Sequence, residues 1–376
     1  MMKTNPLQQL QTLGQSIWYD NIQRSMLGSD GELARMIRDE GLAGVTSNPT
    51  IFEKAIGGSN DYDASLRQLL QQNSQLSNRE LFFSLAIEDI QQAADLLLPV
   101  YKKSDGRDGY VSLEVSPDLA YNTEGTIAEA KDLAHRVNRP NLMIKVPATR
   151  EGVPAIEALT AAGISTNATL LFSMERYAEV AQAYIRGLRQ RQQQRLPVDR
   201  IASVASFFIS RVDALIDKLL DEKLAAGGKP ELKALKGQVA IANAKASYLV
   251  YQRLFGEPFA DLANIGARSQ RLLWASTGVK NPDYSDILYI EELIGLDTVN
   301  TVPPATYAAY LDHGKPSATL EAGSKEAPAL LAQLTPAGID LNAATQQLED
   351  EGVKSFDKSF QTLLAAIEGK ARSLAA

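Results

Sequence analysis

A short apolar run at residues 142–149, Leu-Met-Ile-Lys-Val-Pro-Ala-Thr, contains one lysine, Lys145. Its β-branched residues and its proline, which cannot continue a central ladder, predict a buried parallel strand that ends near Pro147. Burying an ammonium group is costly, so a lysine at the carboxyl end of such a strand has a partner or a chemical task. A desolvated amine can attack a carbonyl carbon and form a Schiff base. The alternative is a lysine whose stem is buried while its ammonium group reaches water.

Polar side chains also recur where other predicted strands stop. One amine, two acids, two amides and several hydroxyls form a set that suits a polyhydroxylated carbonyl substrate. The amine would form the covalent adduct, an acid would move a hydroxyl proton, and the amides and hydroxyls would hold the sugar oxygens. Besides Lys145, the candidates at strand ends are Asp20, Asn48, Glu114, Asn167, Thr169, Ser206 and Ser276.

Two cationic residues lie just beyond two of these strands. Arg211 follows the strand that ends near residue 205, and Lys280 follows the strand that ends near residue 276. A phosphate ester needs a cationic clamp of this kind. We therefore expect Arg211 and Lys280 to bind a substrate phosphate, with ordinary surface charge as the alternative for each of them.

Eight short strands, separated mostly by helices, are needed to position these groups. Eight β/α alternations without a glycine-rich dinucleotide fingerprint favour a closed barrel over a doubly wound sheet. The predicted fold class is therefore α/β, a single (β/α)8 TIM-type barrel, and such barrels carry their chemistry at the carboxyl ends of the strands. The predicted strands are residues 16–20, 43–46, 110–115, 142–147, 164–170, 200–205, 271–276 and 298–302.

The remaining segments predict helices. Thr126 and Glu129 have the spacing of a capping box at the start of one helix. Residues 58–106 are predicted to form an extended helical excursion, and residues 324–376 to form extra C-terminal helices packed across the barrel. Because these helices are expected to lie on the barrel, residues 1–376 are predicted to form one domain.

Composition narrows the class of protein further. The chain has 376 residues, of which 45% are hydrophobic and 22% charged, and its net charge is −7. These proportions are typical of a soluble protein with a large core, and the acidic balance argues against a nucleic-acid partner. No run approaches a membrane span or a signal peptide, so we expect a cytoplasmic protein without a membrane partner. Either a monomer or a homodimer is compatible with the sequence.

The supply of cysteine and histidine excludes several kinds of site. The chain has no cysteine and only two histidines, His135 and His313. The chain therefore has almost none of the side chains that form a thiol nucleophile, a cysteine-ligated zinc site or a Ser-His-Asp triad. We expect no metal and no cofactor. His135 falls in a helical pattern as a solvated residue. His313 precedes Gly314 and is predicted to lie at a helix C-terminus, where a cation suits the helix dipole.

Four sequence runs together resemble those of the transaldolase family. They are Gly-Val-Thr-Ser-Asn-Pro-Thr at 44–50, Val-Ser-Leu-Glu-Val at 111–115, Ile-Lys-Val-Pro-Ala-Thr at 144–149 and Asn-Ala-Thr-Leu-Leu-Phe-Ser at 167–173. They occur in the order found in the family and span much of the chain, with an acid-ended strand before them and Ser206 and Arg211 after them. The resemblance is to the longer bacterial form.

The resemblance implies specific roles for the reacting groups. Lys145 matches the Schiff-base lysine, and Asp20 matches the acid that handles the C4 hydroxyl proton during aldol cleavage. Glu114 and Thr169 match the pair that holds a catalytic water near the Schiff base.

The resemblance also implies roles in substrate binding. Asn48 and Asn167 match amides that contact the dihydroxyacetone part, and Ser206 matches a nearby hydroxyl contact. Arg211 matches a phosphate-binding arginine. Lys280 lies in the segment that carries a second phosphate-binding arginine in better-known forms.

Phe208 bears on the fate of the enamine that aldol cleavage would leave on the lysine. Related sugar-phosphate aldolases tend to have a tyrosine at the matching place, which can orient a water that hydrolyses the adduct. Because phenylalanine has no hydroxyl, we expect the enamine to last long enough to meet an acceptor aldehyde.

Three functions follow as hypotheses. The first is cofactor-free transfer of a dihydroxyacetone unit from sedoheptulose 7-phosphate or fructose 6-phosphate to glyceraldehyde 3-phosphate or erythrose 4-phosphate, in the pentose phosphate pathway. The second is a Schiff-base aldolase that releases free dihydroxyacetone. The third is a non-catalytic barrel that binds sugar phosphates. The two acids beside the lysine argue against the third, because a binding protein needs no proton shuttle.

Overall fold

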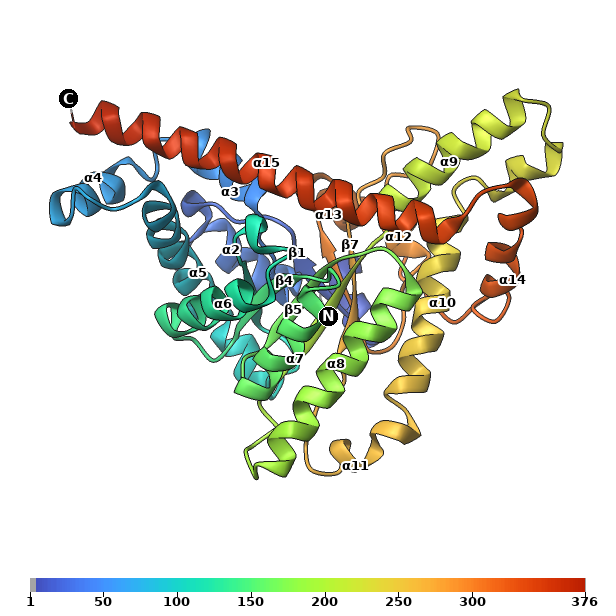
Figure 1. The fold of residues 1–376 in the computed structure, drawn as a ribbon, viewed down its shortest axis with the longest axis horizontal. Helices are drawn as coiled ribbons and strands as arrows, with labels where there is room; N and C mark the ends of the chain where they lie inside the picture. The colour runs from blue at the N-terminus through green and yellow to red at the C-terminus, as the bar shows by residue number, and fades with distance from the viewer. Residues whose placement is uncertain (1–4, 376) are drawn as a thin grey trace.

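The protein is a closed barrel of eight parallel strands, ordered β1 to β8 around the barrel, in a computed structural model that describes residues 5–375 (Figure 1). The predicted (β/α)8 fold class is confirmed. All eight predicted strands are present, with shifted ends in some of them. Their bounds are β1 Gln15–Tyr19, β2 Gly44–Val45, β3 Tyr110–Glu114, β4 Leu142–Pro147, β5 Thr166–Leu171, β6 Ser203–Phe208, β7 Arg271–Ala275 and β8 Thr298–Val302.

Helices surround the barrel and connect the strands. Gly41 and Gly163 follow helical segments in the left-handed conformation, with φ of 85° and 88°, which glycine adopts without a Cβ penalty. The α-helices are α1 Pro6–Thr12, α2 Glu32–Arg35, α3 Pro49–Gly57, α4 Asp63–Gln72, α5 Asn78–Lys103, α6 Thr123–Val137, α7 Gly152–Ala162, α8 Met174–Gln193, α9 Ser210–Ala225, α10 Val239–Leu254, α11 Ala260–Ala263, α12 Leu288–Glu291, α13 Pro304–His313, α14 Ala327–Ala332 and α15 Leu341–Ala375.

The predicted bounds of β6 are wrong by three residues. The strand begins at Ser203 rather than Arg200, and it continues to Phe208. Residues 201–209 are almost continuously apolar, so the sequence does not mark where pairing starts, whereas the ladder with β7 pairs Val204 with Arg271 and Phe208 with Ala275. As a result Ser206 and Phe208 lie on the strand itself.

The predicted capping box in α6 is also wrong. The helix begins at Thr123, and the Asn122 side chain accepts a hydrogen bond of 2.9 Å from the Gly125 amide. Asparagine is a favoured N-cap residue, and the Gly125 amide three residues later has no partner within the helix. The helix therefore starts one turn earlier than predicted. Glu129 instead accepts a hydrogen bond from the Ser116 backbone amide.

The two predicted helical additions are present. The excursion at residues 58–106 contains α4 and α5, and the segment from residue 324 contains α14 and α15. Figure 1 shows α15 as one long helix across the molecule, and it contacts α3, α4, α5, α9 and β5. His313 is the last residue of α13, as predicted. Within residues 5–375, no helix has the length and apolarity needed to span a membrane.

The two ends of the barrel differ in chemistry. At the amino ends of the strands, Arg271 is buried, and its Nη2 lies 2.9 Å from Asp108 Oδ1 while its Nη1 donates to Ser16. Although burial opposes it, Arg271 holds the pKa of Asp108 below its usual value. These charges satisfy one another at that end, whereas the carboxyl ends surround a cavity lined by Lys145.

Gly152 fixes the turn between β4 and α7, next to the strand that carries Lys145. A Cβ at this position would lie 1.9 Å from the carbonyl oxygen of Pro147, which is backbone and cannot rotate away. We predict that Gly152→Ala lowers the free energy of unfolding by about 2–3 kcal/mol, because the added methyl must displace β4 or α7. The urea midpoint of the variant measures this change.

Gly369→Ala is the matched control. A Cβ at Gly369, in the exposed C-terminal part of α15, would meet nothing within 4 Å. Alanine there should leave the protein as stable or raise its stability by up to about 1 kcal/mol, because glycine is a poor helix former. Equal urea midpoints for Gly152→Ala and wild type would contradict the prediction.

Candidate active site

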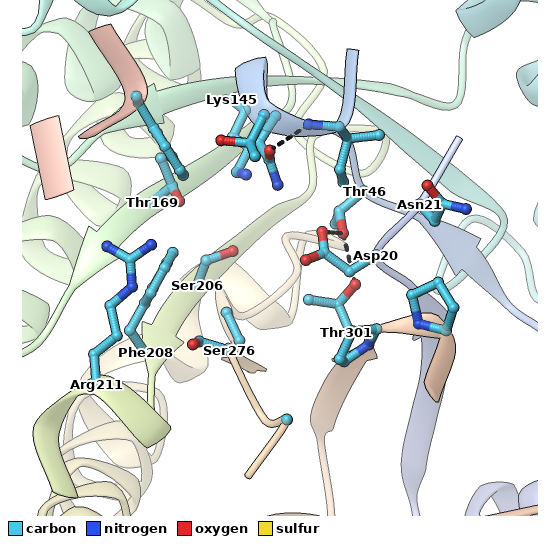
Figure 2. Close-up of a pocket in the computed structure, with 18 of the residues that line it drawn as sticks. Asp20, Asn21, Thr46, Lys145, Thr169, Ser206, Phe208, Arg211, Ser276 and Thr301 are labelled. Carbon is cyan, nitrogen blue, oxygen red and sulfur yellow. Dashed lines mark hydrogen bonds between the residues drawn. The ribbon is translucent and has the colours of Figure 1, made fainter. Parts of the chain in front are cut away.

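A cavity of about 370 Å³ lies at the carboxyl ends of the strands, the face predicted to carry the chemistry. Figure 2 shows Asp20, Thr46 and Thr301 on one side of it and Phe208 and Arg211 on the other. Most of the predicted site residues line this cavity: Asp20, Asn48, Lys145, Thr169, Ser206, Phe208, Arg211, Ser276 and Lys280.

Glu114 and Asn167 lie behind the cavity lining and contact residues that line it. The β3–β4 register places Glu114 beside Lys145, and the β4–β5 register places Lys145 beside Asn167. Three neighbouring strands therefore present an acid, an amine and an amide side by side. The predicted site residues are gathered in one place by strand register.

Lys145 is 4% exposed and lies on β4. Its Nζ is 3.3 Å from Glu114 Oε2 and donates to the carbonyl oxygen of Ser47 at 3.1 Å. The Phe356 ring centroid lies 5.8 Å from the same nitrogen. The amine is thus held by one carboxylate and one carbonyl, with an aromatic face nearby.

Glu114 and Thr169 offer oxygens that are not used elsewhere. Apart from the contact with Lys145, neither carboxylate oxygen of Glu114 has a hydrogen-bond partner among residues 5–375, and the same holds for Thr169 Oγ1. Burial raises the pKa of Glu114 to about 7, since the opposing effect of Lys145 is smaller and Asp20 adds to the rise. A carboxyl that titrates near neutral pH beside an amine is suited to moving protons.

Asp20 follows β1 and is held in one orientation. Thr46 Oγ1 donates to Asp20 Oδ1 at 2.7 Å and lies 2.6 Å from Thr301 Oγ1. Burial raises the pKa of Asp20, while Lys145 and the Thr46 hydrogen bond act in the opposite direction. This second acid faces the cavity with its other oxygen available to a ligand.

The amides and the Ser206 hydroxyl are partly committed to the protein. Ser206 Oγ donates to Asn167 Oδ1 at 2.6 Å, and Asn167 Nδ2 donates to Ser112 Oγ at 3.1 Å. Asn48 has extended backbone, as its position before Pro49 predicts, and its Oδ1 caps α3 by accepting from the Ile51 amide at 3.0 Å. The Asn48 amide nitrogen has no hydrogen-bond partner among the described residues.

Arg211 is the cation best placed for an anionic ligand. It lies in the first turn of α9, half-buried, with its guanidinium carbon 5.5 Å from the Phe208 ring centroid. Across residues 5–375, no carboxylate lies within ion-pair distance of it. Burial lowers its pKa, and Glu351 partly opposes this effect. A guanidinium that is desolvated and unpaired is suited to bidentate phosphate binding.

Ser276 and Lys280 lie on the segment after β7. Ser276 adopts a φ of 54° and its Oγ lies 3.0 Å from that of Ser210, beside Arg211. Lys280 lines the cavity but is exposed. The structure therefore brings both predicted phosphate cations to one cavity, with Arg211 the more enclosed of the two.

Several lining residues were not predicted. Thr46 and Thr301 orient Asp20, and Lys54 brings a further exposed cation from α3. Thr46 stands in the run that contains Asn48, which could have drawn attention to it. Phe356 falls in the segment predicted to form extra C-terminal helices, and no local pattern distinguishes it from core packing.

The arrangement suits covalent carbonyl chemistry. One buried amine, two acids of raised pKa and a separate arginine without an ion-pair partner among residues 5–375 surround a space large enough for a sugar phosphate. Among residues 5–375, no three histidine, aspartate or glutamate side chains are grouped as metal ligands would be.

Comparison with known proteins gives one consistent result. A family model described as Transaldolase/Fructose-6-phosphate aldolase matches residues 17–367. The chain is similar to a transaldolase of Thiobacillus denitrificans, with 49% identity over 356 residues that cover 94% of this chain and 97% of the relative. It is also similar to transaldolase 2 of a Nostoc species, at 44% over 99% of both chains, and to a transaldolase of Thermobifida fusca, at 48% over 96% of both.

The raised pKa of Glu114 predicts a pH-dependent stability. Its pKa in the folded protein, about 7, lies above the ordinary value of 4.5. Between pH 4.5 and pH 7, the folded protein therefore keeps a proton on Glu114 that the unfolded chain has lost. The stability that this proton confers is present below pH 4.5 and is lost as pH rises through 7. Relative to Glu114→Gln, the wild type should lose on the order of 3 kcal/mol between pH 5 and pH 8. Urea unfolding of both proteins at each pH measures this change.

Glu231→Gln serves as the control, because Glu231 is an exposed carboxylate far from the barrel interior. Its stability difference from wild type should change little with pH. A difference between wild type and Glu114→Gln that stays constant from pH 5 to pH 8 would show that Glu114 has an ordinary pKa.

Proposed function

The chain belongs to the transaldolase/fructose-6-phosphate aldolase family, and from that premise we propose how its residues transfer a dihydroxyacetone unit between sugar phosphates. It is a transferase, a transaldolase by similarity over nearly its full length. The observation that carries the proposed mechanism is the buried Lys145 Nζ, 3.3 Å from Glu114 and in the same cavity as Asp20.

The reaction begins at Lys145. Glu114, through a water, takes one proton from the Lys145 ammonium, and the amine attacks the C2 carbonyl of a ketose phosphate. A second proton moves from the nitrogen to Glu114 by the same route, and both are returned to the former carbonyl oxygen, which leaves as water and gives a protonated Schiff base. The unpaired oxygens of Glu114 and Thr169 are suited to hold the water that carries protons in these steps.

Cleavage then depends on Asp20. Its carboxylate removes the proton of the C4 hydroxyl, the C3–C4 bond breaks, and the electron pair of that bond moves into the Schiff base to give an enamine. The aldose phosphate leaves with a C4 aldehyde. An acceptor aldehyde is attacked by the enamine carbon, Asp20 returns the proton to the new hydroxyl, and hydrolysis releases the new ketose phosphate.

The substrate phosphate is assigned to Arg211. Its unpaired guanidinium lies across the cavity from Asp20 (Figure 2), so a phosphate bound there leaves the carbon chain to extend towards Lys145. Sedoheptulose 7-phosphate and fructose 6-phosphate are the proposed donors, with glyceraldehyde 3-phosphate and erythrose 4-phosphate as acceptors. Asn48, Asn167 and Ser206 are assigned to the dihydroxyacetone part.

Transfer is preferred to release of free dihydroxyacetone. Phe208 packs against Phe172, with ring centroids 5.1 Å apart, and presents no hydroxyl to the cavity. A water for hydrolysis therefore has no donor or acceptor at this position. We place the reaction in the pentose phosphate pathway of the cytoplasm, without a cofactor, and a monomer or a homodimer stays the expectation for the assembly.

Trapping the adduct tests the proposed function. Borohydride reduction with fructose 6-phosphate present should attach a reduced three-carbon unit to Lys145, found by peptide mass mapping. Addition of erythrose 4-phosphate before the borohydride should abolish most of the label, because the acceptor takes the unit away. Lys145→Met should show neither label nor activity.

Lys245→Met is the matched control for the trapping experiment. Lys245 is also buried, 8% exposed, but it lies on α10 and donates to the carbonyl oxygen of Ala322. This variant should keep the label on Lys145. An unlabelled Lys145 in folded wild-type protein would leave the non-catalytic sugar-phosphate barrel as the better hypothesis.

The phosphate assignment gives a second prediction. Arg211→Lys should raise the KM for fructose 6-phosphate by about 10- to 100-fold, because an ammonium cannot replace the two parallel hydrogen bonds of a guanidinium. The kcat/KM for unphosphorylated fructose should change little. Lys280→Gln should raise the KM for fructose 6-phosphate less, since Lys280 is exposed. Equal losses with fructose and fructose 6-phosphate in Arg211→Lys would place the phosphate elsewhere.

A further inference from the structure

The C-terminal helix α15 takes part in the cavity as well as covering the barrel. In Figure 1 it runs across the molecule over α3, and Phe356, near its middle, is one of the residues that line the cavity. Phe356 is 5% exposed, and its ring centroid lies 5.8 Å from Lys145 Nζ. The ring is thus the apolar side chain that α15 presents to the reacting nitrogen.

The helix is anchored by contacts away from that ring. Ser359 accepts a hydrogen bond of 2.9 Å from Thr50 on α3, and Lys370 lies 2.8 Å from Asp63 on α4. Phe360 packs edge-on against Phe82 of α5, with ring centroids 5.5 Å apart. These contacts attach α15 to the barrel at positions other than Phe356, which lies over the cavity.

We infer that Phe356 is a specificity-determining residue that keeps water from the Lys145 adduct, so that the three-carbon unit reaches an acceptor instead of being released. This inference rests on the proposed function. The polar groups around Lys145 come from the barrel strands, and Phe356 adds an apolar surface from outside the barrel. An apolar ring in this place denies water a hydrogen-bonding position next to the adduct.

The step that Phe356 would suppress is a hydrolysis. The enamine takes a proton on carbon and becomes an iminium, water adds to the iminium carbon, and the carbon–nitrogen bond breaks. The products are free dihydroxyacetone and the Lys145 amine, and no oxidant or reductant is needed. Productive transfer uses the same enamine, so the two fates compete and their ratio reports the access of water.

The test compares Phe356→Ala with Phe356→Leu. Each variant is given fructose 6-phosphate with and without erythrose 4-phosphate, and free dihydroxyacetone and transfer product are both measured. Phe356→Ala should raise the ratio of release to transfer by about tenfold. Phe356→Leu should stay near wild type, because leucine restores an apolar cover without an aromatic ring. This comparison separates water exclusion from an aromatic effect on the cationic adduct.

Leu363→Ala controls for loosening of the helix. Leu363 is fully buried on α15 and does not line the cavity, so its truncation weakens packing without opening the site. It should leave the ratio of release to transfer unchanged. A ratio that rises equally in Leu363→Ala and Phe356→Ala would overturn the inference in favour of general helix loosening.

Borohydride trapping in the same samples separates the two proposals. If wild type forms no adduct on Lys145, the proposed function fails and the inference falls with it. If the adduct forms in wild type and Phe356→Ala but the ratio of release to transfer is the same in both, the inference alone is wrong. Should Phe356→Ala fail to fold, Phe356→Leu decides the question. A tenfold rise in its ratio of release to transfer would contradict water exclusion by an apolar side chain.

Discussion

The pairing of Lys145 with Glu114 inside the barrel is the interaction on which the site depends. Removing an ammonium and a carboxylate from water costs several kcal/mol for each ion, and their attraction at 3.3 Å only partly offsets this cost. The raised pKa of Glu114 is the direct consequence, since burial favours the neutral acid. A carboxyl with a pKa near 7 is suited to taking up and returning a proton near neutral pH. The same desolvation that weakens the pair as a structural element therefore makes it suitable for chemistry that forms and breaks a Schiff base.

Parallel strand register is what makes such a pair possible. In a closed parallel barrel all strands end on one face, so residues at equivalent heights on neighbouring strands face the same space. Glu114, Lys145 and Asn167 occupy paired positions on β3, β4 and β5, and a shift of one residue in any strand would turn its side chain away. At the opposite end of the barrel, the charges of Arg271 and Asp108 are paired with each other. Burial of each strand on both faces keeps this register fixed.

This geometry explains what the sequence could and could not predict. The site residues at strand ends could be predicted because the topology of a parallel barrel brings the carboxyl ends of all its strands to one face. The ends of β6 were misplaced because the run that contains Ser206 is almost continuously apolar, and pairing with β7 decides where the strand stops. The start of α6 was misplaced because Asn122 competes as a cap with Thr126. Phe356 reaches Lys145 through tertiary packing, and no periodicity in α15 distinguishes a residue over the cavity from one over the core.

At two positions at the cavity end of the barrel, the backbone adopts a conformation that the residue itself disfavours. Leu170 and Ser276, neither of them glycine, have φ of 59° and 54°. Such conformations cost of order 1–3 kcal/mol each and persist only when their surroundings hold them. Leu170 lies where the β5–β6 register shifts, between the pairs Ala168–Ala205 and Leu171–Phe207. At Ser276 the backbone carbonyl accepts a hydrogen bond of 3.0 Å from the Ser210 amide, beside Arg211. Each distortion thus adjoins a residue that lines the cavity, Thr169 in one case and Arg211 in the other. Burial of a large core supplies the stability that allows both distortions.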